Sequence, residues 1–167
     1  MKNDLVLLFR RLTYGVYVVG ITHNNKNNAF TAAWIMQVSY SPLLLALGIN
    51  PNHSSYKMLI QSGAFSVNVL SSKNRDLARH FGQPATVDKL AGVKWHPSKS
   101  DTPILDDAIA WFDCKYSHEC PAGDHVIIFG RVMDGAILDT GSLPMNYRDT
   151  CNMDESSKLY PDDFYER

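Results

Sequence analysis

Cysteine, net charge and long apolar runs are all scarce in this chain, and each shortage excludes a class of protein. The three cysteines, Cys114, Cys120 and Cys151, are an odd number and form no Cys-x-x-Cys pair, which argues against a disulfide framework. A formal net charge of -1 provides no electrostatic footprint for nucleic acid, and no Lys/Arg cluster suggests a membrane surface. No apolar run approaches the roughly 20 residues that span a bilayer. The expected partner is a small molecule or another protein.

Several nucleotide-binding and hydrolase motifs are also missing. Neither Gly-x-Gly-x-x-Gly nor Gly-x-x-x-x-Gly-Lys-[Ser/Thr] occurs, so a nicotinamide cofactor would have to bind without a Rossmann unit. The absence of Gly-x-Ser-x-Gly argues against an esterase. Arg10 and Arg11 follow a short apolar stretch, which is the reverse of the order in a signal peptide, so a cytoplasmic protein is expected.

What the chain does contain is a series of short apolar segments separated by turn residues. Its 167 residues are 45% hydrophobic and 20% charged, which is typical of one domain with a core. The run at 43–49 would also suit a short buried helix, but Pro42 and Pro51 on either side favour a strand. Strands are predicted at residues 14–21, 30–39, 43–49, 64–70, 110–120 and 125–133, with a polar turn at 23–28 joining the first two.

Helical patterns are fewer. Helices are predicted over residues 5–12, from a cap at Ser54 or Ser55 to Gly63, over 72–81, and near 87–91 within a long loop at 83–107. Six or seven short strands with two or three helices between them predict a mainly β fold. We expect an antiparallel barrel with peripheral helices and Greek-key-like connections.

The clearest period-two alternation lies near the C-terminal end of the predicted barrel. One face of this predicted strand carries Ala110, Phe112, Cys114, Tyr116, His118 and Cys120. The other face carries Asp113, Lys115, Ser117 and Glu119. A turn at 121–123 should then return the chain as a partner strand.

Three segments combine residue types that could bind a ligand. In the first, small residues, a hydroxyl and an indole follow one another from Thr31 through Ala32 and Ala33 to Trp34, with Ser39 further along. Small side chains let a ligand approach the backbone, and an indole can pack on a flat ring. A strand with Trp34 in the core explains the same pattern, so composition leaves both interpretations open.

The second segment joins a predicted strand to a helix start and includes Asn50, His53, Ser54 and Ser55. Helix N-termini offer unpaired N–H groups and a favourable dipole, so a phosphate could bind here. Serines cap helices in many proteins, so the pattern taken alone favours capping over phosphate binding.

The third segment is the turn that carries Asp124 and His125. A carboxylate beside an imidazole can orient it for proton transfer or for contact with an anion. A polar turn is the simpler alternative. Zinc is the other hypothesis for the histidines, since Cys114, His118, Cys120 and His125 are zinc-type ligands, but their spacing lacks a compact knuckle, so no metal site is predicted.

The order of several short motifs resembles a known family. These motifs are residues 14–19 (YGVYVV), 30–34 (FTAAW), 38–42 (VSYSP), 62–70 (SGAFSVNVL), 87–93 (VDKLAGV) and 123–125 (GDH). Their order and spacing resemble the flavin reductase-like, FMN-binding split β-barrel family, from about residue 10 to 148. The resemblance implies a domain over residues 1–150 and leaves 151–167 as a C-terminal tail.

The resemblance implies a homodimer that holds FMN at the subunit interface, with NADH or NADPH as the electron donor and a second acceptor, such as a monooxygenase. It implies that residues 31–34 and Ser39 flank the flavin, that Asn50, His53, Ser54 and Ser55 lie on its phosphate side, and that Lys89 reaches the cofactor or the nicotinamide. His125, oriented by Asp124, becomes the candidate residue for contact with the nicotinamide or for help with a proton transfer.

Trp34 is similar to the flavoredoxin-like branch of that family, in contrast to reductases with a second serine at this place. Three functions therefore stay open. The first is an NAD(P)H:flavin oxidoreductase. The second is an FMN electron carrier without a free nicotinamide substrate, and the third is a haem-binding barrel.

Overall fold

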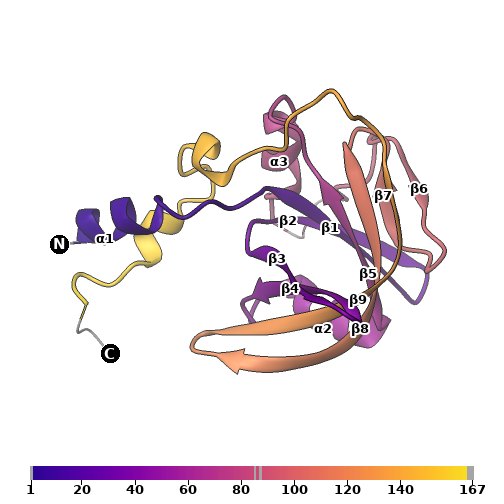
Figure 1. Ribbon diagram of the computed structural model, residues 1–167, viewed down its shortest axis with the longest axis horizontal. Coiled ribbons are helices and arrows are strands. Elements are labelled where there is room, and N and C mark those ends of the chain that lie inside the picture. Colours follow the sequence, from indigo (N-terminus) through magenta and orange to yellow (C-terminus); the bar gives the residue numbers. More distant parts are fainter. Residues whose placement is uncertain (1, 85, 87, 165–167) are drawn as a thin grey trace.

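Seven antiparallel strands form one curled sheet in the computed structural model, which describes residues 2–84, 86 and 88–164 (Figure 1). The strand order across the sheet is β2-β1-β5-β8-β9-β4-β3. The predicted mainly β, antiparallel class with peripheral helices is confirmed. The strands of this sheet are β1 (Tyr17–His23), β2 (Lys26–Ala32), β3 (Ile35–Tyr40), β4 (Leu43–Ile49), β5 (Ala64–Val69), β8 (Ala110–Ala122) and β9 (His125–Ile137).

The first hairpin joins β1 to β2 through a tighter turn than the predicted 23–28. His23 pairs with Lys26, which leaves Asn24 and Asn25 as a two-residue turn with φ of 50° and 58°. Asparagine tolerates this left-handed backbone better than most residues, and two positive φ values match the twist of the flanking strands.

The predicted single strand at 30–39 is wrong, because the chain breaks at Ala33 and Trp34. β2 and β3 on either side of this break lie at opposite edges of the sheet. Two residues span at most about 10 Å, so the two edges must approach each other here and the sheet must curl. The break therefore forms the junction at which the curled sheet comes closest to closing.

Helix α2 (Ser54–Ser62) follows β4 and packs against the inner face of the sheet. Its end at Gly63 is confirmed, with φ of 70° and an N–H that donates to the Leu59 carbonyl. The main core beneath it is formed by Val19, Ile21, Phe30, Ile35, Leu45, Leu47, Ile49, Leu59, Phe65, Val67, Cys114 and Ile128.

A second core lies under α3 (Arg75–Phe81), which begins later than the predicted 72–81. Its buried residues are Val16, Val18, Ala29, Leu70, Ala78, Phe81, Leu90, Leu105, Ala108 and Met145. In the predicted loop at 83–107, the chain instead forms a small sheet from β6 (Trp95–Pro97) and β7 (Pro103–Leu105). The short helix predicted near 87–91 is not formed over 88–91, where the chain makes turns, and residue 87 lies outside the described residues.

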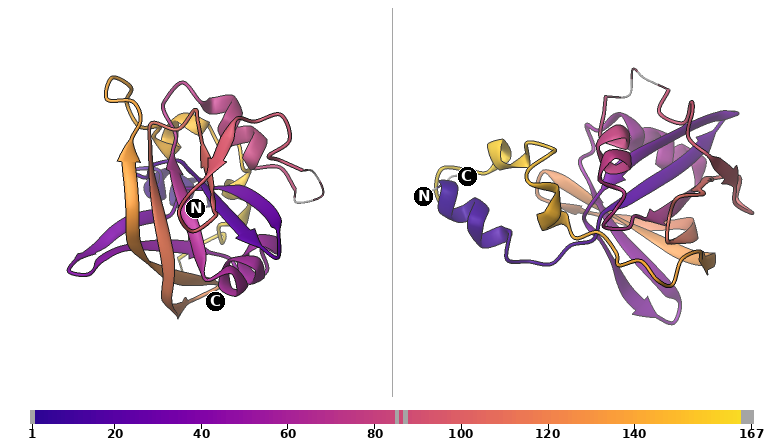
Figure 2. Two further views of the ribbon diagram at one scale, coloured as in Figure 1. Left: turned by 90° about the vertical axis from the view of Figure 1, so that its right-hand side faces the viewer. Right: turned by 90° about the horizontal axis from the view of Figure 1, so that it is seen from above.

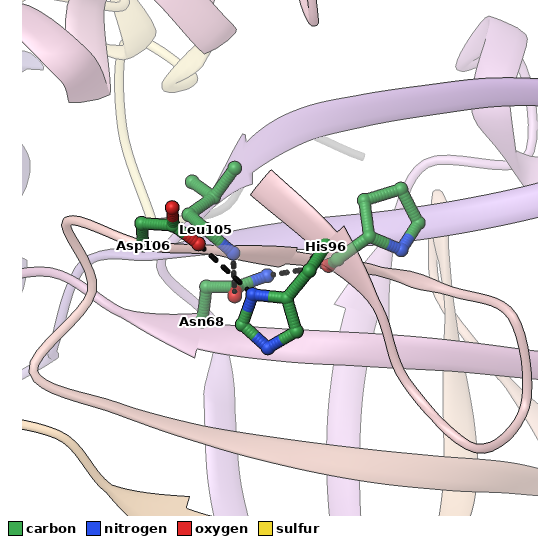
Figure 3. Close-up of polar contacts among 5 residues, drawn as sticks. Asn68, His96, Leu105 and Asp106 are labelled. Atoms are coloured by element: carbon green, nitrogen blue, oxygen red, sulfur yellow. Dashed lines mark hydrogen bonds and ion pairs between the residues drawn. The ribbon is translucent and has the colours of Figure 1, made fainter. Parts of the chain in front are cut away.

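Asn68 attaches this small sheet to the large one. Its fully buried side chain accepts from the Leu105 N–H at 2.8 Å and donates to the Val18 carbonyl at 3.1 Å and to the Pro103 carbonyl at 3.2 Å. Figure 3 shows the Asn68–Leu105 hydrogen bond beside the hydrogen bond between Nδ1 of His96 and Oδ1 of Asp106, which are 2.9 Å apart.

The long β8–β9 hairpin does not keep the predicted alternation. One register shift lies between Asp113 and Cys114, and a second lies between Tyr116 and His118. After the second shift His118 is exposed and stacks on Phe129 with ring centroids 4.4 Å apart, while Asp113, which precedes both shifts, is buried and accepts from the Ser100 N–H. A bulge adds one residue to one strand and moves the following side chains to the other face.

The two ends of the chain form an arm that projects from the sheet (Figure 2). It contains α1 (Lys2–Phe9), which begins and ends earlier than the predicted 5–12, and the short 3-10 helices η1 (Tyr147–Thr150) and η2 (Ser156–Leu159). Phe9 contacts Tyr160, with ring centroids 5.5 Å apart. Among the described residues, no helix is long and apolar enough to cross a membrane.

Candidate functional site

The β2–β3 junction and the tip of the β8–β9 hairpin meet at one end of the sheet. The indole of Trp34 lies 4.7 Å from the imidazole of His125, with an angle of 50° between the rings. Trp34 is 48% exposed, so it is not the buried core residue of the simpler interpretation. The structure thus brings together two residues that the sequence placed in separate motifs.

Asp124 holds the other side of the His125 ring. Its Oδ1 lies 2.8 Å from Nδ1 of His125, and this hydrogen bond keeps the pKa of the Asp124 carboxyl below its usual value. The carboxylate is open to solvent while the imidazole is mostly covered. A carboxylate at Nδ1 fixes the ring orientation and leaves Nε2 for a ligand or a proton.

Gly48 on β4 provides the space for the indole. Its N–H donates to the Trp34 carbonyl at 2.8 Å, and a Cβ at this position would lie 3.2 Å from both Cβ and Cε3 of Trp34. Sequence reasoning missed this glycine, although an isolated glycine inside an apolar strand often marks a close approach of this kind.

The loop from Asn50 to His53 turns the chain from β4 into α2. The Asn50 side chain accepts from the Asn52 N–H at 2.9 Å, and His53 caps the helix by accepting from the Ser55 N–H at 3.2 Å. The prediction that Ser54 or Ser55 caps α2 is therefore wrong. The neutral imidazole has a free acceptor nitrogen, so it can take the place of a serine hydroxyl.

The first turn of α2 offers fewer free donors than the sequence suggested. The Ser55 N–H is used by the His53 ring, and the Tyr56 N–H donates to the His53 carbonyl at 3.0 Å. Ser55 is buried and accepts from Nδ2 of Asn28 at 2.8 Å, whereas Ser54 is exposed. Ser54 and the remaining hydroxyl proton of Ser55 are the groups that stay available.

Lys89 adds a buried positive charge next to this loop. It is only 4% exposed, and its Nζ donates to the carbonyls of Phe81 at 3.1 Å and Gln83 at 3.0 Å. Burial lowers the pKa of Lys89. The pKa of His53 is lowered first by partial burial of its ring and then by the charge of Lys89, so the two side chains lie within electrostatic range.

Two predicted site residues are placed differently from the expectation. The Thr31 hydroxyl donates to the Ala78 carbonyl at 2.7 Å, so its proton is already used within the fold. Ser39 lies near the far end of β3, about 16 Å along the strand from Trp34 at the usual rise per residue. Ala32 and Ala33 are half-buried at the junction itself.

A pocket of about 500 Å³ lies elsewhere and contains none of the predicted site residues. It is lined by Ser62, Gly63, Ala64, Lys99, Ser100, Asp113, Lys115, Met133 and Asp134. Lys99 and Asp134 pair across it at 2.7 Å, and the buried Asp113 carboxylate accepts from the Ser100 N–H. Three of the charged groups of this pocket therefore already have partners within the fold.

Cys114 is fully buried in the main core, which raises the pKa of its thiol to about 12. Cys120 is exposed on the hairpin. Within residues 2–84, 86 and 88–164, no three His, Cys, Asp or Glu side chains gather in a way that could hold a metal ion.

Comparison with known proteins identifies the family. Residues 9–152 match the family described as flavin reductase like domain. The reductase component of a flavin-dependent trigonelline monooxygenase from Acinetobacter baylyi is 30% identical over 139 residues, covering 78% of this chain and 44% of that protein. The reductase subunit HsaB of a flavin-dependent monooxygenase from Mycobacterium tuberculosis is 31% identical over 118 residues, covering 71% and 63%.

Among solved structures, the NADH:FAD oxidoreductase SgcE6 of Streptomyces globisporus superposes with a TM-score of 0.81 at 26% identity, covering 89% of this chain and 90% of that one. The chain spans 24% to 63% of the length of the curated relatives that it matches. The family match covers most of the chain, and the sheet, the junction and the hairpin tip all lie within it. The chain belongs to the flavin reductase like domain family.

Proposed function

We propose that this protein binds FMN at the β2–β3 junction and passes electrons from NADH or NADPH to the flavin or to a downstream acceptor. One observation carries the proposal. The exposed indole of Trp34 and the ring of His125 lie at the same end of the sheet as the start of α2, and the buried Lys89 is near that helix start. This end of the sheet could bind a ligand that combines a flat ring with an anionic group.

The phosphate side of the proposed site is the start of α2. Ser54 and Ser55 would hold the phosphate with their hydroxyls, and Lys89 would supply its charge. Lys89 has no carboxylate partner among the described residues. A buried cation in that situation is costly, and an anion nearby would offset the cost. Asn50 and His53 would shape the loop, and His53 would keep the helix start intact through its cap.

The ring side of the proposed site is the junction itself. Trp34 would pack on the isoalloxazine, and the small side chains of Ala32 and Ala33 would let the ring approach the backbone. Thr31 would contribute through its position beside α3, because its hydroxyl proton is used by Ala78. We place Ser39 at the outer end of the same strand pair.

A bound flavin would supply the hydride chemistry. The chain therefore need only bind and orient the flavin and the nicotinamide, and exclude side reactions. His125, held by Asp124, would contact the nicotinamide or hold a proton at Nε2. SgcE6, which shares this fold, is named an NADH:FAD oxidoreductase, and this supports a nicotinamide donor. That name also makes FAD the competing flavin.

We further propose a homodimer with flavin at its interface. β3 is an edge strand whose apolar side chains Met36, Val38 and Tyr40 are exposed, the first and last by 66% and 86%. Residues 27–56 contain no charged side chain. Edge strands are usually protected by charges or by a covering element, so a second copy of the chain is a natural cover.

Two relatives are reductase components of flavin-dependent monooxygenases, which supports a monooxygenase as the downstream partner. We propose residues 1–150 as the flavin-binding domain and 151–167 as a tail, acting in the cytoplasm. A second candidate is an electron carrier without free nicotinamide. The observation that favours it is the Trp34 indole, which already packs against the His125 ring.

Titration of the purified protein with FMN, FAD and riboflavin tests the proposal. FMN should bind more tightly than riboflavin, because riboflavin lacks the phosphate, and FAD should gain nothing over FMN. Equal affinity for FMN and riboflavin would show that the phosphate does not bind at the start of α2. A Soret band in the purified protein, without affinity for any flavin, would instead favour a haem-binding module.

A further inference from the structure

The β-bulge between Tyr116 and His118 turns Glu119 toward α2. Strict alternation would place Glu119 on the same face as Lys115, which is exposed. The structure instead places its Oε1 2.9 Å from the Tyr56 hydroxyl, which donates to it. Bulges commonly re-aim a side chain in this way next to functional sites.

The second oxygen of Glu119 makes this contact unusual. Among the described residues, Oε2 of Glu119 is the one buried side-chain polar atom without a hydrogen-bond partner. A buried carboxylate oxygen without a donor is costly, and such groups in folded proteins call for an explanation. Within the part of the chain that the structure describes, the Tyr56 hydroxyl is therefore the one hydrogen-bond donor to this carboxylate.

The two residues come from the two halves of the proposed site. Tyr56 lies in the first turn of α2, directly after Ser54 and Ser55. Glu119 lies near the tip of the hairpin that carries Asp124 and His125. The Tyr56–Glu119 hydrogen bond thus joins the phosphate side to the side that carries His125.

The two halves differ in how firmly they are otherwise held. α2 is anchored by Leu59 in the main core and by the Ser62 hydroxyl, which donates to the Thr22 carbonyl. The hairpin tip over residues 117–124 is largely exposed, and its backbone pairs only within the hairpin. Loss of the tether would therefore free the tip more than the helix.

We propose that Tyr56 and Glu119 are positioning residues that hold the hairpin tip, and with it His125, at a fixed place relative to the start of α2. The inference rests on the proposed function, because His125 matters only if it meets a nicotinamide. Neither residue touches the reacting groups itself.

The test uses the full-length double variant Tyr56→Phe/Glu119→Ala. Tyr56→Phe alone leaves both carboxylate oxygens without a donor, so it should lower Tm more than the double variant, which removes the carboxylate as well. In the double variant, the KM for the nicotinamide should rise about 3- to 10-fold, with kcat and the flavin Kd within about twofold of wild type. Adding His125→Ala should abolish the difference in KM, because the tether acts through that ring.

Hydrogen exchange supplies a readout that does not need activity. Amides over residues 117–124 should exchange faster in the double variant, while those of the β1–β2 hairpin and of the β4-paired part of β9 stay unchanged. Tyr116→Phe is the matched control, since the hydroxyl of this half-buried neighbour makes no hydrogen bond with any described residue. It should change neither the KM nor the exchange rates.

Unchanged exchange at the tip, or faster exchange without a rise in KM, would overturn the inference. If wild-type protein with bound flavin oxidises no nicotinamide, the proposed function fails, and the exchange rates alone then decide whether the tether exists.

Discussion

The indole of Trp34 rests beside the imidazole of His125 with the ring centroids 4.7 Å apart, over a glycine that leaves room for it. Residues from β2–β3, β4 and β9 thereby share one surface. An exposed aromatic ring at such a meeting point is a natural place for a flat cofactor ring. This contact underlies the first prediction.

Trp34→Ala should raise the flavin Kd about 3- to 10-fold, because aromatic pairs contribute roughly 0.5–1.5 kcal/mol beyond their area. Fluorescence titration with FMN measures this change. Trp95→Ala is the control, since it removes an equally large ring from the small sheet. If the Trp34 variant binds FMN as tightly as wild type, the indole does not contact the flavin.

Lys89→Met should weaken FMN binding about tenfold and leave riboflavin binding unchanged, because only FMN brings an anion to the lysine. Stability should fall modestly, because methionine leaves the Phe81 and Gln83 carbonyls without the Lys89 donor. Parallel titrations and thermal melts separate the two effects. Equal losses for FMN and riboflavin would indicate a structural role instead.

His53 should make stability depend on pH. Its folded-state pKa is lowered by burial and by Lys89, so its contribution is complete above the unfolded value near 6.5 and is lost as pH falls through the folded value. As the pH falls from the unfolded pKa to the folded pKa, the unfolded chain is protonated at His53 before the folded chain is. Once protonated, the folded ring can no longer accept the hydrogen bond from the Ser55 N–H. Tm should therefore fall below about pH 6.5.

The control for this prediction is His53→Asn, because asparagine is a good helix cap that does not titrate in this range. The variant should keep its stability near neutral pH and show a smaller fall in Tm in acid. Identical pH profiles for the two proteins would assign the acid sensitivity to other groups.

Asn68→Ala should lower the free energy of unfolding by about 2–4 kcal/mol, because it leaves several buried backbone groups without partners. Hydrogen exchange should also quicken over residues 94–106, since the small sheet loses its attachment (Figure 3). Chemical denaturation gives the first quantity. A loss below about 1 kcal/mol would show that the two sheets are held mainly by apolar packing.

The strands with strong local patterns were predictable. Residues 43–49 are apolar and bounded by two prolines, and the structure forms β4 over the same residues. Gly63 ends α2 as predicted, because only a left-handed residue closes the helix there. In these segments, local conformational preference and tertiary packing favour the same structure.

The errors arose where long-range contacts outweigh local preference. The break at Ala33 and Trp34 follows from the curl of the sheet, which β-propensity over 30–39 does not contain. The cap at His53 depends on a ring whose pKa is lowered by burial and by a lysine from another part of the chain. The small sheet of β6 and β7 exists because Asn68 binds it, and a three-residue strand has almost no pattern of its own.

The candidate site was predictable in part. Asp124 and His125 form the expected pair, and Trp34 lies beside them. The sequence alone did not indicate Gly48 or the Tyr56–Glu119 hydrogen bond, because both depend on contacts between distant strands and on a bulge. The same bulge explains why Glu119 was predicted on the wrong face.

The most direct test of the central claim is anaerobic mixing of the FMN-loaded protein with NADH or NADPH, followed by absorbance near 450 nm, where flavins generally absorb. The proposed function predicts that the flavin band bleaches within seconds with at least one of the two nicotinamides. A yellow protein whose band persists with both, yet bleaches when a reduced protein partner is added, would contradict the reductase and identify an electron carrier.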